Sequence, residues 1–275
     1  MNDEWIQGSQ PVADRLNVRR ELSIVRHDPL AALLQAIPRP DHSALLVDEV
    51  ARWEQAWSYY RLSFTRLVPA IAVTLRWMNG PQWTQKAGRR FSEREKPLVR
   101  RYRELRPYLN LDFANFLMHA RILCDRAAGI ARYFVRGHPL PSFTSFADHR
   151  AFFAKGRFPG SEAAAYGTDL VARTTWFEMP LKHVRDKFMV HTGPRHLPLF
   201  GQGEGHDLEL VLFVPAGDDR ARPLERVRLV RVSARRLARE IDDFLRWFAG
   251  YGLGTLHAGE PRANSTLQPT PTRAT

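Results

Sequence analysis

Cysteine is nearly absent from this 275-residue chain, which holds only Cys124, in an apolar stretch. A disulfide framework is therefore excluded, and a buried, reduced thiol in a cytoplasmic protein is expected. The longest apolar run, residues 67–75, is far shorter than the roughly 20 residues that a membrane-spanning helix needs. The first residues show no basic segment followed by an apolar one, so we expect no secretory signal.

Sequence motifs for metals and nucleotides are missing as well. The ten histidines are scattered, and neither an H-E-x-x-H motif nor a paired-cysteine spacing occurs. The glycine-rich residues 201–205 lack the Lys-Ser/Thr of a phosphate-binding loop and precede a predicted strand. We therefore expect no metal and no cofactor.

Lysine is scarce too, because five of the 41 basic residues are lysine and the other 36 (41 − 5) are arginine. The formal net charge is +12 and the pI is about 10.5. Such a charge favours polyanionic partners such as RNA. An arginine excess can also reflect genome composition, so the charge permits nucleic-acid binding without identifying it.

Apolar residues recur at helical spacing along most of the chain, which predicts a mainly all-α fold, an antiparallel helical bundle. A small β-hairpin is expected at about residues 207–232, where two runs rich in β-forming residues flank a Pro/Gly/Asp loop. The predicted helices cover residues 30–37, 41–78, 86–106, 111–135, 146–153, 161–191 (kinked or restarted at Met179-Pro180) and 233–250.

The same pattern predicts one helical domain, residues 23–257, between two loose ends. Residues 1–22 are polar with a weak apolar pattern and are expected to form a flexible arm. Residues 258–275 are rich in Pro, Thr and other polar residues and are expected to be disordered. In the apolar helix 111–135, Asp125 should bind a cation or a helix end, because buried polar groups need partners.

Residues 86–106 form the most basic segment, with nine basic and three acidic residues, a net charge of 9 − 3 = +6. Ser92 and Glu95 have the spacing of a capping box, so an exposed basic helix is expected. Two interpretations of its charges are open, a solvated face and a nucleic-acid surface. In the second interpretation Arg100 and Arg101 are candidate phosphate contacts.

Arg185 and His191 lie near the expected end of the helix 161–191. An arginine can hold a phosphate in a fork of donors, and a histidine can move protons near neutral pH. Pairs with similar spacing, Arg20/His27 and Arg132/His138, also occur in this arginine-rich chain about as often as chance predicts. Context distinguishes Arg185, which Asp186 follows within an amphipathic pattern.

A purely structural interpretation competes with the catalytic one. Basic residues in the last turn of a helix gain roughly 0.3–1 kcal/mol from the helix dipole. On an ideal helix, Arg185 and His191 would point about 120° apart. The two side chains can converge only if the helix ends near His191, as Thr192-Gly193-Pro194 favours.

The stretch Arg-Asp-Lys-Phe-Met-Val-His (residues 185–191) resembles the R-x(4–6)-H motif of the HEPN (higher eukaryotes and prokaryotes nucleotide-binding) superfamily. The long apolar helix with Asp125-Arg126, and the aromatic segment 143–153 before the motif, are similar to bacterial HEPN-like proteins. The resemblance implies an α-helical bundle that forms a homodimer and acts as a metal-independent endoribonuclease. Such enzymes serve in toxin–antitoxin and defence systems.

Carried onto this chain, the resemblance implies that His191 is the general acid/base, Arg185 the clamp on the phosphate and Asp186 an orienting residue. Lys182 and Lys187 would be nearby phosphate contacts. The partners would be RNA, a second copy of the chain, and an antitoxin or other protein. A catalytically inactive RNA-, nucleotide- or protein-binding module is the alternative, and a membrane-surface protein using the basic helix is a third interpretation.

Overall fold

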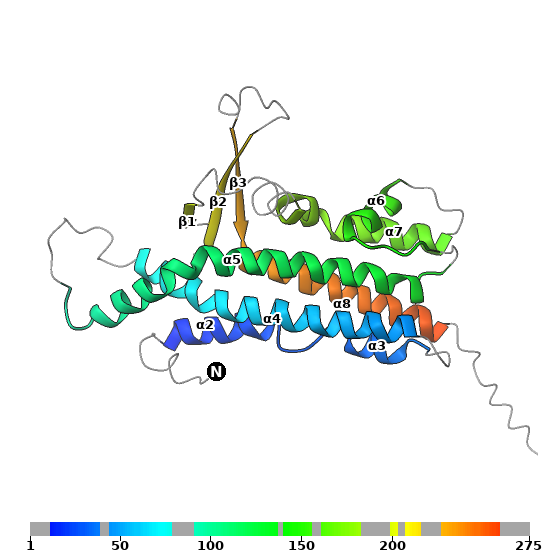
Figure 1. Ribbon diagram of the computed structural model, residues 1–275, viewed down its shortest axis with the longest axis horizontal. Helices are drawn as coiled ribbons and strands as arrows, with labels where there is room; N and C mark the ends of the chain where they lie inside the picture. The colour runs from blue at the N-terminus through cyan, green and yellow to red at the C-terminus, as the bar shows by residue number, and fades with distance from the viewer. Residues whose placement is uncertain are drawn as a thin grey trace, which may run out of the picture.

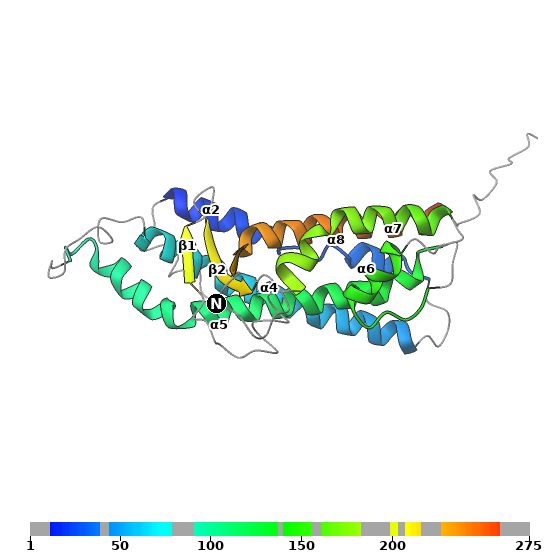
Figure 2. The same cartoon turned by 90° about the horizontal axis from the view of Figure 1, so that it is seen from above.

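A computed structural model describes residues 12–38, 44–78, 91–136, 140–155, 161–182, 199–202, 207–215 and 227–258. Figures 1 and 2 show an elongated helical bundle from which a small sheet stands out. The mainly α-helical fold with an appended hairpin is confirmed. None of the helices in these ranges is long and apolar enough to span a membrane.

Two 35-residue helices, α4 (Ala44–Met78) and α5 (Lys96–Ile130), form the centre of the bundle. They run antiparallel along its long axis (Figure 1). The predicted apolar stripe of α4 faces inward, and Tyr60 and Phe64 place their rings 5.6 and 5.5 Å from that of Phe116. Cys124 is buried on α5, as its apolar surroundings predicted.

Helix α5 corrects the expectation of two separate helices over residues 86–106 and 111–135. It begins at Lys96 and continues through Pro107 to Ile130. A proline inside a helix removes one hydrogen bond and is an ordinary cause of a kink. Accordingly, α5 changes direction within its first part (Figures 1 and 2).

The N-terminal part of the chain also differs from the expected flexible arm. Residues 12–23 form α2 (Val12–Ser23), which packs along α4, and Val18 is buried there. The predicted short helix follows as α3 (Ala31–Ala36). The Asp28 carboxylate accepts hydrogen bonds from Leu30 N and Trp53 Nε1, both at 2.9 Å, and so joins this region to α4.

The last helix, α8 (Ala234–Ala258), begins where the sequence predicted and ends later. Ser233 Oγ accepts a hydrogen bond from Arg236 N at 3.0 Å, which is the expected cap. The helix continues past Gly250, where a Cβ would meet nothing within 4 Å, and of its glycines only Gly252 serves packing. A Cβ on Gly252 would lie 2.6 Å from Leu33 Cδ1, so only glycine lets α3 approach this closely.

Helix α6 (Phe146–Ala154) lies over the second half of α5, and α7 (Ser161–Arg173) packs beside α6 and lies over α8 (Figures 1 and 2). The helix expected over residues 161–191, kinked or restarted at Met179-Pro180, is interrupted earlier than predicted in the part that the structure describes. After Arg173 the chain forms a 3-10 turn, η2 (Thr175–Phe177), and a π turn, η3 (Glu178–Lys182). The break comes before Met179-Pro180, because Arg150 binds the end of α7 through Thr174 Oγ1 (2.7 Å) and Val171 O (3.3 Å).

The described strands form one antiparallel sheet in the order β1-β2-β3. The predicted hairpin is present as β2 (Leu208–Pro215) and β3 (Val227–Ser233), with Leu210 opposite Val232. Strand β1 (Leu199–Gln202) was not expected from the sequence. Leu208 and Val232 are buried and join the base of the sheet to the bundle.

Candidate nucleic-acid interface

The basic start of α5 is held in place by contacts with the end of α4. Trp77 and Tyr102 stack with ring centroids 4.7 Å apart and planes 9° apart. Arg106 Nη1 donates a hydrogen bond to Tyr102 Oη at 2.9 Å. This aromatic contact fixes one side of the helix, so that its other side faces solvent with its arginines.

The expected capping box is half formed. The Glu95 carboxylate accepts hydrogen bonds from both Ser92 N and Ser92 Oγ at 2.8 Å. The helix itself begins one residue after Glu95, so Ser92 is not its N-cap residue. Even so, these bonds order the chain that leads into α5.

The two predicted phosphate contacts on α5 have different surroundings. Arg101 is half-buried and Nη1 lies 2.9 Å from Glu104 Oε2. Arg100 is exposed and has no acidic partner in the described part of the chain. Arg94 and Arg103 share these properties and were not singled out from the sequence. Their signal was available, since Arg100 and Arg103 are three residues apart and therefore lie on one face.

Lys182 lies elsewhere on the bundle. It ends η3 and binds Glu178, with Nζ 3.1 Å from Oε2. The turns before it pack on the second half of α5, where Arg121 Cζ lies 4.4 Å from the Phe177 ring centroid. A helix rises ~1.5 Å per residue, so Arg101 and Arg121 are roughly 30 Å apart along the axis. The structure therefore does not bring Lys182 together with Arg100 and Arg101.

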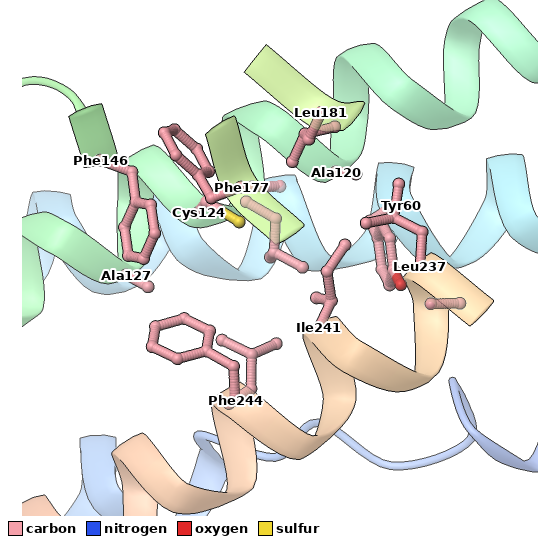
Figure 3. Close-up of a cluster of buried hydrophobic side chains, with 14 of the residues drawn as sticks. Tyr60, Ala120, Cys124, Ala127, Phe146, Phe177, Leu181, Leu237, Ile241 and Phe244 are labelled. Atoms are coloured by element: carbon pink, nitrogen blue, oxygen red, sulfur yellow. The ribbon is translucent and has the colours of Figure 1, made fainter. Parts of the chain in front are cut away.

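The predicted catalytic residues Arg185, Asp186 and His191 lie outside the described residues, as does Lys187. The described residues just before them, in η3, pack against α5. Leu181 is fully buried, and Figure 3 shows it beside Ala120 of α5.

A buried arginine on α5 packs against the turn η2. Arg121 is 5% exposed, and its Nε lies 3.2 Å from Asp125 Oδ1 while its guanidinium covers Phe177. Asp125 Oδ1 also accepts a hydrogen bond from Phe146 N at 2.7 Å, at the first residue of α6. Asp125 thus binds both a cation and a helix end, as expected from the sequence.

No family model, curated protein or solved structure matches this chain. Functional assignment therefore depends on the chemistry of its own residues.

Two titratable groups in the core of the bundle, Cys124 and His149, have pKa values shifted by burial. Burial raises the pKa of the Cys124 thiol far above its usual value, which keeps it protonated and unreactive. Burial also lowers the pKa of His149 to about 3, so this histidine stays neutral in the folded protein. Neither group is suited to exchange protons with a ligand at neutral pH.

Among the described residues, no group of three or more His, Cys, Asp or Glu side chains could hold a metal ion. What the described surface offers is a set of fixed positive charges on the first half of α5. Arginine keeps its charge at all physiological pH values and can bind phosphate with two donors. The surface is therefore suited to an extended polyanion.

Proposed function

We propose that this protein is an RNA-binding endoribonuclease of the HEPN type, which binds RNA along the first half of α5 and acts as a homodimer. The observation that supports RNA binding is a set of exposed arginines, Arg100 and Arg103 on one face of α5 and Arg94 just before the helix, which lack acidic partners in the described ranges. Each phosphate neutralised by such a cation releases counterions and so contributes to affinity.

Cleavage is proposed from the sequence motif. His191 would take the proton from an RNA 2′-hydroxyl while that oxygen attacks the adjacent phosphorus. The bond from phosphorus to the 5′-oxygen breaks, and the leaving oxygen receives a proton, which yields a 2′,3′-cyclic phosphate and a 5′-hydroxyl. Arg185 would stabilise the extra negative charge, and Asp186 would orient one of the two side chains. General acid–base catalysis of this kind contributes about 10²–10⁴ in rate.

The test is cleavage of end-labelled RNA by the full chain in EDTA, compared between the wild type, His191→Ala and Arg185→Ala. We expect each substitution to lower the cleavage rate by at least about 10² and to leave the circular-dichroism spectrum unchanged. His138→Ala is the matched control, because Arg132 and His138 have the same spacing as Arg185 and His191.

Products that persist in both variants would exclude the proposed catalytic pair. RNA binding by the wild type without any products would instead support the catalytically inactive binding module. In both cases the salt dependence of RNA binding tests the surface on α5 separately.

A further inference from the structure

A small pocket between the end of α7 and α8 has a composition unlike the rest of this basic protein. Its volume is about 220 Å³, and it is lined by Arg173, Trp176, Glu240, Asp243 and Phe244. Two of the five are acidic and two are aromatic. A volume of this size suits one side-chain-sized group rather than a nucleotide.

The floor of the pocket is aromatic and well fixed. Phe244 is 1% and Trp176 6% exposed, and their ring centroids are 6.3 Å apart. Trp176 Nε1 donates a hydrogen bond to Arg173 O at 3.0 Å, which sets the orientation of the indole. An indole face attracts cations within about 6 Å of its centroid, more strongly than other aromatic rings do.

The acidic wall comes from one face of α8, since Glu240 and Asp243 are three residues apart. Neither carboxylate has an ion pair or hydrogen bond to another described side chain. By contrast, Asp242 on the same helix lies 2.7 Å from Arg246 Nε. Arg236 and Arg246 act on Glu240 and Asp243 through longer-range electrostatic attraction and not through a direct ion pair.

Partial burial and the negative charge of Asp243 raise the pKa of Glu240, and the positive charge of Arg236 lowers it. A cation in the pocket would offset this cost of burying negative charge. Arg173 forms no ion pair with either carboxylate in the described part of the chain. Its guanidinium instead covers the Trp247 ring, 5.5 Å from the centroid.

We infer that this pocket binds an organic cation, a primary ammonium or guanidinium group, held by Glu240 and Asp243 over the face of Trp176. A metal ion suits the site less well, because two carboxylates beside aromatic rings supply too few oxygen ligands for a hard cation. The cationic group can belong to a small amine or to an arginine side chain of a partner protein.

The test is titration of the full chain with agmatine and, separately, with the peptide acetyl-Gly-Arg-Gly-amide, followed by the NMR signal of the Trp176 indole N–H. Trp176→Phe identifies that signal among the seven tryptophans. Acetyl-Gly-Gln-Gly-amide is the neutral control peptide. We expect saturable shifts with a guanidinium ligand and none with the glutamine peptide.

Removing the charges should remove the binding. Glu240→Gln combined with Asp243→Asn should weaken agmatine binding by at least about tenfold, because two charge-assisted hydrogen bonds are lost. Asp242→Asn is the matched control on the same helix and should bind normally. Arg173→Gln should bind more tightly, since it removes the one opposing charge from the lining.

The outcomes separate the two sources of the cation. Saturable binding of agmatine alone assigns the pocket to a small amine, and binding of the arginine peptide as well assigns it to a partner's side chain. The inference is overturned if neither probe shifts the Trp176 signal, if the glutamine peptide binds equally, or if the double variant binds as the wild type does. RNA cleavage is expected to be unchanged in the double variant, so this test is independent of the proposed nuclease activity.

Discussion

Both halves of α5 are α-helical, but the first half forms surface and the second half forms core. In the first half, residues 96–112, four residues are buried (Val99, Tyr102, Leu109 and Asp112) and most of the arginines face solvent. In the second half most positions are buried, because α4, α6, α8 and η3 all pack against it. The comparison shows that the neighbours of a helix, more than its own composition, decide whether it becomes surface or core.

Arginine illustrates this difference. Arg100 in the first half needs no partner, because water solvates its charge. Arg121 in the second half is buried, and its charge is balanced by Asp125 and by the face of Phe177. An unpaired charge at such a depth would be strongly destabilising. The same residue type is thus a ligand-binding group in one half and a structural support in the other.

The largest expected effect tests the buried half. Phe116→Ala removes a fully buried ring that contacts Tyr60 and Phe64. We expect the free energy of unfolding to fall by about 3–5 kcal/mol, because apolar contacts are lost and a cavity remains. Urea denaturation measures this loss. Leu111→Ala is the control on the same helix, where the side chain is 55% exposed, and should change stability by less than about 0.5 kcal/mol.

A similar loss in both variants would contradict the contrast between a buried and an exposed position within one helix. A loss below about 1 kcal/mol for Phe116→Ala would show that the surrounding helices close the cavity.

A smaller effect depends on pH and again concerns the neighbours of the buried half. His149 on α6 is fully buried among aromatic rings, with Tyr166 Oη 3.3 Å from its Nε2. Burial lowers its pKa from 6.5 to about 3. Between these values the unfolded chain binds more protons than the folded one, so stability falls as the pH falls below about 6.5.

The contribution of His149 is at most about 1.4 kcal/mol for each pH unit in this window. His149→Phe should remove it, so that urea denaturation at pH 7, 6 and 5 shows a shallower loss for the variant than for the wild type. Parallel losses in the two proteins would show that other groups cause the acid sensitivity. The arginines of the first half of α5 do not titrate in this range and should not contribute.

Most of the helical fold could be predicted because apolar periodicity records which face is buried. The end of α4 at Met78 and the hairpin followed from such local patterns and from proline and glycine positions. Pro107 and Gly250 misled the prediction, since each usually marks a helix end. At both places tertiary packing continued the helix, and a sequence pattern does not show which element will pack there.

The candidate site was less predictable. The charge of the arginines in the first half of α5 indicated that they are exposed. It did not indicate that Arg101 pairs with Glu104 while Arg100 and Arg103 have no acidic partner in the described residues. The distance between Lys182 and these arginines depends on the 3-10 and π turns after α7, which interrupt the expected helix before Met179-Pro180. The pocket beside Trp176 also depends on those turns, so no spacing in the sequence indicated it.

The smallest effect on stability belongs to the exposed half, where the change should appear in binding. Arg100→Gln combined with Arg103→Gln should alter the free energy of unfolding by less than about 0.5 kcal/mol, because both side chains are solvated. If the two arginines contact phosphates of single-stranded RNA, the slope of log K against log salt should fall by about 1.4. Fluorescence anisotropy at several salt concentrations measures this slope.

The control variant replaces two exposed arginines that have acidic partners, Arg52 and Arg246, with glutamine. It therefore has the same net charge as the Arg100/Arg103 double variant. If both double variants lose the same affinity, attraction depends on net charge alone, and the first half of α5 is not the RNA-binding surface.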